Sequence, residues 1–357
     1  MTSLLSRIAL FSFFTAGVLV AEDKDPKPVD FPKGPGNEWL VMEPGADAAK
    51  KGKHILLVSG DDEYRSEEVL PQLGKLLAEK HGFHCTVTFS IDPKTGNVDP
   101  GNHTNLPGLA AMDQADLIIM LWRFREPKDE DMKRFESYLK AGKPIIALRT
   151  STHAFAFDAN PDSPYAKYDW QSKKPGFVGG FGKTILGETW VDHWGHHAVQ
   201  GTKAIPEPSD KTSLITKGVG EITGDTDVYE AHPPADATIL YRGQVLSTLA
   251  PDSPPATGPR KTQEINHPMM PIVWTREFKN EFGTTNKVLV STIGSATDFK
   301  NKALRHLMIN AVHHLLGLPV PENPNTDFTP NYAPTKYGFG SFKKNQKPKD
   351  FLAAPAK

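Results

Sequence analysis

The chain has 357 residues, of which 41 are Lys or Arg and 42 are Asp or Glu, so its formal net charge is −1 at pH 7. That length suits one large domain or two small ones. The balanced charge argues against a nucleic-acid partner, because such proteins carry a basic excess or stripe. Cys85 is the only cysteine, which excludes an intramolecular disulfide, and its setting is typical of a buried, inert thiol.

The first 21 residues have the pattern of an export signal. Arg7 precedes an apolar run over residues 8–20, and Ala21 closes a site of the signal-peptidase type. The run is too short to cross a bilayer comfortably and no later run is longer, so we expect no membrane span. Export of a chain without disulfides favours a bacterial periplasm or secretion.

Residues 22–52 are rich in Pro, Gly, Asp and Lys, which predicts a linker or surface arm. Beyond them, short apolar runs alternate with segments of helical periodicity. The expected strands are residues 54–59, 117–121 and 143–148, and the expected helices are residues 67–81 and 129–141. This alternation predicts an α/β fold with a doubly wound, mostly parallel sheet and helices on both faces.

The second half of the chain is less regular. Two proline-rich loop insertions are expected at residues 158–178 and 249–271. Two strands are expected at residues 272–275 and 288–293, and a helix at residues 301–316. We therefore expect a single α/β domain over residues 53–318. The Pro- and Lys-rich tail, residues 319–357, is expected to pack over the surface or fray.

Polar clusters follow the first three expected strands, where ligands bind in open α/β sheets. The candidate substrate-binding residues of these clusters are Asp61, Glu63, Tyr64, Arg65, Arg123, Arg125, Arg149 and Thr150. Their guanidinium groups offer a rigid fork of donors that suits hydroxyl, carbonyl or carboxylate oxygens. The alternative is that these arginines pair with nearby acids.

A histidine-rich block over residues 188–197 is the densest chemical cluster, with three of the thirteen histidines. His193 and His197 have the i, i+4 spacing of helical zinc ligands, but Gly195 argues against a helix there. In an extended segment His193 and His197 still share a face, and His196 points the other way. With His153 as a third ligand, His193 and His197 would hold Zn, Fe or Mn. Metal-free proton transfer and a structural role stay open.

Three tryptophans surround the same region in the sequence: Trp170, Trp190 and Trp194. They suit stacking against sugar rings, with Trp190 as the main candidate, or burial in the core. Asp298 is expected to cap the helix that follows it. A nucleophile elbow, a Walker A loop and a dinucleotide fingerprint after the first strand are missing from the sequence.

Together, these segments resemble the ThuA-like (trehalose utilisation) family of the class I glutamine-amidotransferase-like superfamily. The resemblance runs from about Lys53 to Leu318 and is carried by SGDDEYRSEEVLPQL, LRTSTHAF, GGFGKTILGETWVDHWGHH, TDVYEAHP and GSATDF. It implies a flavodoxin-like sheet and a role in sugar metabolism, with oxidised or keto-disaccharides as substrates. Amidotransferases place a cysteine at the strand-end turn where this chain has Arg149 and Thr150, so we expect no glutamine hydrolysis.

These observations predict an exported sugar-processing enzyme, either a hydrolase, a lyase or an isomerase, whose partner is a small carbohydrate. His153, His193 and His196 are the expected catalytic residues. The alternative from another class is a non-catalytic carbohydrate-binding or scaffold protein of the same fold.

Overall fold

The computed structural model of the chain describes residues 38–208, 213–328 and 332–352. These residues belong to one compact unit, and the expected export signal lies outside them. None of the helices in the described ranges combines the length and apolar character that a bilayer crossing requires.

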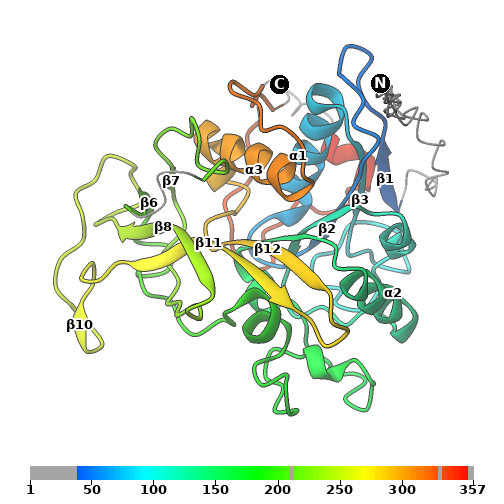
Figure 1. Ribbon diagram of the computed structural model, residues 1–357, viewed down its shortest axis with the longest axis horizontal. Helices are drawn as coiled ribbons and strands as arrows, with labels where there is room; N and C mark the ends of the chain where they lie inside the picture. Colours follow the sequence, from blue (N-terminus) through cyan, green and yellow to red (C-terminus); the bar gives the residue numbers. More distant parts are fainter. Residues whose placement is uncertain (1–37, 209–212, 329–331, 353–357) are drawn as a thin grey trace, which may run out of the picture. The chain divides into compact units, whose positions relative to one another are not determined.

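A ten-stranded mixed sheet forms the centre of the fold, with the order β1-β3-β2-β4-β5-β12-β11-β8-β6-β7 (Figure 1). Its strands are β1 (Trp39–Met42), β2 (His54–Gly60), β3 (His84–Thr88), β4 (Leu117–Trp122), β5 (Ile145–Leu148), β6 (Thr202–Pro206), β7 (Thr223–Gly224), β8 (Ala237–Val245), β11 (Met270–Lys279) and β12 (Thr285–Ser291). A separate two-stranded ribbon contains β9 (Pro259–Arg260) and β10 (Gln263–Glu264).

The five strands β3-β2-β4-β5-β12 are parallel to one another, and β1 joins their edge antiparallel to β3. In chain order these five strands read 2-1-3-4-5, which is the flavodoxin-like order. The predicted doubly wound sheet is therefore confirmed. The order reverses between β2 and β4, and ligands of such sheets bind outside the carboxyl ends of the strands at that point.

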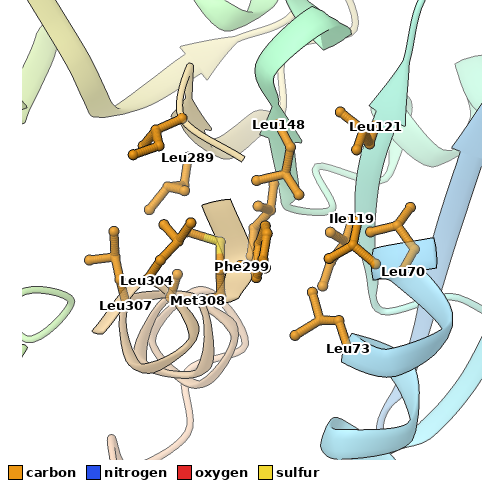
Figure 2. Packing of buried hydrophobic residues seen from close by; sticks show 14 of the residues in the cluster. Leu70, Leu73, Ile119, Leu121, Leu148, Leu289, Phe299, Leu304, Leu307 and Met308 are labelled. Carbon is orange, nitrogen blue, oxygen red and sulfur yellow. The ribbon is translucent and has the colours of Figure 1, made fainter. Parts of the chain in front are cut away.

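Alternating side chains of the strands feed two separate hydrophobic clusters. Ile119 of β4 and Leu148 of β5 face α1 (Ser66–His81) and α3 (Lys302–Leu315) (Figure 2). The opposite face packs against α2 (Asp129–Lys140) and the loop that follows β5. Burial on both faces explains why these strands read as continuous apolar runs in the sequence. Helices thus cover both faces, as expected.

The ends of the helices follow local signals. α1 ends at Gly82, whose φ of 78° is left-handed and whose N–H bonds back to Ala78. Asn301 caps α3, because its side-chain oxygen accepts hydrogen bonds from the N–H groups of Ala303 and Leu304. The expectation that Asp298 caps this helix is wrong. Asp298 instead accepts from the backbone of Gly294 and Ser295, in the turn after β12.

Short helical turns complete the described secondary structure, at Leu109–Asp113, Arg149–His153, Ala166–Tyr168, Gly182–Leu186, Asp298–Lys300 and Pro348–Leu352. The turn Arg149–His153 begins directly after β5 and carries several of the predicted site residues.

Two segments expected at the surface contribute to the packed structure. Residues 39–42, inside the expected linker, form the edge strand β1, whose Leu40 is buried in the core. In the tail, Tyr337 and Phe351 are buried, and the Phe351 ring stacks on that of Phe89. Aromatic anchors of this kind explain why the described part of the tail lies against the domain.

Candidate functional site

Asp227 is the centre of a buried hydrogen-bond network at the carboxyl edge of the sheet. Its Oδ1 accepts hydrogen bonds from Arg149 Nη2 at 2.9 Å and His197 Nδ1 at 3.1 Å, and its Oδ2 accepts from His193 Nδ1 at 2.8 Å. One carboxylate therefore joins the end of β5 to the histidine block.

Arg149 reaches this position because the chain turns sharply after β5. Its φ of 40° is left-handed, a conformation that costs energy for a residue with a side chain. The guanidinium lies between the rings of Tyr64 and Tyr229, 4.2 Å from each centroid. It also donates to the carbonyl of Thr292 at 2.7 Å and to the Tyr64 hydroxyl at 3.1 Å. These contacts hold a fully buried cation in one orientation.

The charge state of Asp227 follows from its neighbours. Burial alone would raise the pKa of Asp227, but the cation of Arg149 and the hydrogen bonds from His193 and His197 hold that pKa well below its usual range. Asp227 is therefore an ionised carboxylate that orients two imidazoles.

The histidine block is extended and then turns, so it is not a helix. His193 pairs with Tyr229 in an antiparallel bridge, and the N–H groups of Trp194 and Gly195 donate to the carbonyl of Val228. A Cβ at Gly195 would lie 3.3 Å from Asp227 and Val245, so a larger residue there would press on the carboxylate that holds the two histidines. The two rings of His193 and His197 consequently lie on the same side, with centroids 4.7 Å apart.

The ribbon β9-β10 supports this block from behind. Arg260 donates to the backbone carbonyls of His193 and Trp194. The Trp194 ring is buried and donates to the carbonyl of Ile265 at 2.6 Å. Trp194 therefore belongs to the core and is not a stacking surface, whereas Trp170 and Trp190 are partly exposed.

The two paired histidines differ in the surroundings of their second nitrogen. His197 Nε2 lies 3.0 Å from Glu63 Oε1. The hydrogen bonds that the ring donates to Asp227 and Glu63 raise the pKa of His197 to about 9, so its ring carries a positive charge at neutral pH. No carboxylate of the described residues holds His193 Nε2, and this side chain is 31 % exposed.

His153 lies in an adjoining aromatic group. Its ring centroid is 5.1 Å from that of Phe124 and 5.9 Å from that of Trp190, which in turn is 5.7 Å from His193. Burial, and then the cations of Arg123 and Arg149, hold the pKa of His153 well below its usual range. His153 is therefore neutral.

Asp62 and Arg123 form a partly exposed ion pair outside the carboxyl ends of β2 and β4. Arg123 Nη1 is 3.0 Å from one Asp62 oxygen and 3.1 Å from the other. Burial opposes ionisation, but His103 and Arg123 lower the pKa of Asp62 to about 2. The pair thus flanks the point where the order of the parallel strands reverses.

The structure divides the predicted substrate-binding residues into two groups. Arg123 and Trp190 are partly exposed, and Glu63, although only 5 % exposed, contacts the partly exposed ring of His197. The buried group has almost no surface that a ligand could reach in this conformation: Asp61, Tyr64, Arg65, Arg125, Arg149 and Thr150.

The buried group supports the site. Asp61 accepts hydrogen bonds from the backbone of Glu63 and Tyr64 and from the hydroxyl of Thr150, so it shapes the loop after β2. Arg125 donates to Ser90 and to the carbonyl of Asn102, away from the imidazole pair.

His196, expected to be catalytic, does not join the imidazole pair. Its side chain is exposed, and its backbone N–H donates to Gln200 at the turn that follows. A bend at residues 194–195 and a turn that begins at His197 direct the exposed His196 side chain away from the His193 and His197 rings.

Sequence reasoning missed Asp227, Tyr229 and Tyr337 as members of the site. Asp227 and Tyr229 lie in the TDVYEAHP segment, where an acid close to an aromatic residue was a usable signal. Tyr337 lies in the tail, and its ring centroid is 5.4 Å from Tyr64 and 5.7 Å from His197. The local sequence of the tail contains no comparable signal.

A group of side chains that suits a metal ion overlaps the same network. One ligand atom from each of His193, His197 and Asp227 lies within 4.8 Å of the others. Asp227 thus takes the place for which His153 was expected, and the donor set of two imidazoles and one carboxylate is common for Zn and Fe.

Comparisons with known proteins identify the family of this chain. The family model described as trehalose utilisation matches residues 54–315. A solved structure described as a ThuA-like protein from Bacteroides uniformis is 14 % identical, with a TM-score of 0.46, and covers 76 % of this chain and 93 % of its own. A second such structure, from Parabacteroides merdae, is 14 % identical, with a TM-score of 0.44, and covers 84 % of this chain and 99 % of its own. The search of curated proteins found no match. Because the family model covers most of the sequence, the chain belongs to the ThuA (trehalose utilisation) family.

Proposed function

We propose that this protein is an exported enzyme that acts on a saccharide or an oxidised (keto) saccharide by removing a proton from it. The family supports a carbohydrate substrate. The observation that carries the proposal is the pair of imidazoles on one ionised carboxylate, in which one of the four ring nitrogens, His193 Nε2, stays available.

In this proposal His193 is the general base. Asp227 accepts the Nδ1–H of His193, so in the neutral ring the lone pair lies on Nε2 and can take a proton from a sugar hydroxyl or from the carbon beside a keto group. His197, held as a cation, donates both of its ring N–H groups to Asp227 and Glu63, so it fixes the carboxylate that orients His193 and does not itself contact the substrate. Proton removal by His193 begins a hydrolase, a lyase or an isomerase reaction.

The experiment compares His193→Gln with His196→Gln on trehalose, sucrose, methyl glucosides and their 3-keto forms. We expect the first variant to lose about 10²- to 10⁴-fold in kcat, the usual contribution of a positioned acid or base. The second removes an exposed imidazole three residues away and should keep wild-type turnover. Equal kcat in wild type and His193→Gln would remove the proposed base.

Export is part of the proposal because of residues 1–21, which lie outside the described residues. The test expresses the full chain in a bacterium and identifies the mature N-terminus by mass spectrometry. A periplasmic or secreted product that begins near Glu22 supports export, and an intact cytoplasmic chain contradicts it.

A metal-assisted version of the same chemistry is the second candidate. His193, His197 and Asp227 would hold Zn, Fe or Mn, and the ion would act as a Lewis acid. A cationic His197 cannot bind a metal, so the two versions require different protonation states of one ring. A non-catalytic carbohydrate-binding protein is the outcome if sugars bind without turnover in every assay.

A further inference from the structure

The C-terminal strap, which we define as residues 332–343, lies beyond the family match that ends at residue 315. It nevertheless contacts the candidate site. The Tyr337 ring lies against Tyr64 and His197, and its hydroxyl donates to the carbonyl of Asp225 at 2.8 Å. The Gly338 N–H donates to the carbonyl of Glu63 at 2.9 Å. The strap therefore touches two segments that build the imidazole network.

A buried clamp holds the strap in place. Arg65, which has a left-handed φ of 61° just before α1, donates to Thr335, to the carbonyl of Gly338 and to Ser341. Glu68, in the first turn of α1, accepts from the N–H and the hydroxyl of Thr335 and from Lys343 at 3.1 Å. With these contacts on both sides of Tyr337, the backbone of the strap is fixed next to the site.

Phe339 is the unexpected member of this strap. Its side chain is 60 % exposed, although hydrogen bonds hold the backbone of Gly338 directly before it. The guanidinium of Arg123 lies 4.9 Å from the Phe339 ring and 4.4 Å from the Phe124 ring, and it also pairs with Asp62. An exposed aromatic face thus stands beside a carboxylate and a guanidinium.

We propose that Phe339, Phe124, Arg123 and Asp62 form a second sugar subsite, in which the Phe339 ring stacks on the apolar face of a pyranose. Asp62 would accept from vicinal hydroxyl groups and Arg123 would donate to them, as the opposite polarity of the two side chains allows. The subsite flanks the strand-order reversal between β2 and β4, where ligands of this fold bind.

The subsite adds a substrate class to the proposed function. It rests on that function, because the sugar ring that reacts is the one placed at the imidazole pair. A row of rings joins the subsite to the imidazole pair, because Phe124 lies 5.1 Å from His153, His153 lies 5.9 Å from Trp190, and Trp190 lies 5.7 Å from His193. In this arrangement one sugar ring of the substrate lies at the imidazole pair and a second sugar ring stacks on Phe339. The substrate class is therefore a glycoside of two or more rings. The strap then determines which sugars bind, and His193 carries out the proton transfer.

Equilibrium binding tests the subsite without any need for turnover. The probes are trehalose and its 3-keto form, each with two rings, and methyl α-glucoside and its 3-keto form, each with one. Titration calorimetry on the full chain compares wild type, Phe339→Ala and Phe339→Trp. Phe282→Ala is the matched control, because Phe282 is also exposed, at 38 %, and carries Lys140 over its ring, but lies in the turn between β11 and β12 at the opposite edge of the sheet.

We expect Phe339→Ala to reduce the preference for two rings over one by about two- to tenfold, the size of an aromatic stacking contribution. Phe339→Trp and Phe282→Ala should keep the wild-type preference. Where turnover is measurable, Phe339→Ala should raise KM and leave kcat unchanged.

An unchanged preference in Phe339→Ala, or a wild-type protein that binds none of the four probes, would overturn the subsite. The proposed base fails separately: full turnover in His193→Gln with a Phe339-dependent ring preference removes His193 and leaves the subsite intact.

Discussion

Arg149 and Asp227 form an ion pair of 2.9 Å in which both side chains are completely buried. The residues are 78 positions apart in the sequence, and their contact ties the end of β5 to the segment that meets the histidine block. Buried charges are tolerated only when they are paired and hydrogen-bonded, so each partner depends on the other. The orientation of both imidazoles depends on this pair.

Asp227→Ala should destabilise the fold by about 3–5 kcal/mol, because it leaves the Arg149 cation buried without a counter-charge. Urea denaturation measures the change. Glu277→Ala is the control: Glu277 and Lys287 form an exposed ion pair of 3.7 Å, and such pairs contribute at most about 1 kcal/mol. Equal losses in the two variants would show that the buried pair has no special role.

Glu67 gives the protein a pH-dependent stability. It is buried in the first turn of α1, and neither carboxylate oxygen has a hydrogen-bond partner among the described residues. Burial raises the pKa of Glu67 from its ordinary value of 4.5 to about 8. The folded state therefore binds more protons than the unfolded state between these values. This contribution to stability is fully present below pH 4.5 and is lost as the pH rises through 8.

Glu67→Gln should flatten the decrease of the unfolding free energy between pH 5 and 8. The difference in slope from wild type is at most about 1.4 kcal/mol per pH unit, the limit for one proton. Urea denaturation at several pH values checks it, with Glu277→Gln as the exposed control. Identical slopes in wild type and Glu67→Gln would contradict an elevated pKa.

The metal-assisted candidate makes a separate prediction for the purified protein. After growth with added Zn, Fe and Mn, elemental analysis should find about one ion per chain, and His193→Ala should lower this content several-fold. His153→Ala and His196→Ala should leave it unchanged, since neither residue belongs to the group that includes Asp227. A wild-type protein without any of the three metals would leave only the acid–base version.

Arg65→Gln should release the C-terminal strap. The change removes the hydrogen bonds that the Arg65 guanidinium donates to Thr335, Gly338 and Ser341. We expect faster proteolytic cleavage within residues 332–343, located by mass spectrometry, and weaker binding of two-ring sugars. Arg134→Gln, which removes only surface ion pairs at α2, is the matched control. Unaltered cleavage of the strap would mean that other contacts hold it.

Much of the fold was predictable because its signals are local. The apolar runs that became β2, β4 and β5 are buried on both faces, so each reads as a strand without knowledge of its neighbours. The periodicity of α1 and α3 likewise reports the face that packs on the sheet. Strand β1 was missed because it is a short edge strand in a segment rich in Pro and Gly.

The site was only partly predictable. The rings of His193 and His197 do lie together, but a bend and a turn bring them there and not an extended strand, and nothing in the histidine block identifies their common acceptor. Asp227 follows His193 by 34 positions, and Tyr337 comes from the tail. Arg125 and Arg149 look alike in sequence, since each follows a strand end. Only Arg149 turns toward the imidazoles, through its left-handed backbone.

The amino-acid sequence by itself determined the doubly wound sheet, its two buried faces and the edge at which polar side chains gather, because apolar periodicity and strand ends are properties of short segments. The tertiary structure alone decided which of those side chains meet. The pairing of Arg149 with Asp227 and the approach of the strap to His197 depend on the order of strands in the sheet and on contacts between distant segments, which no local pattern encodes.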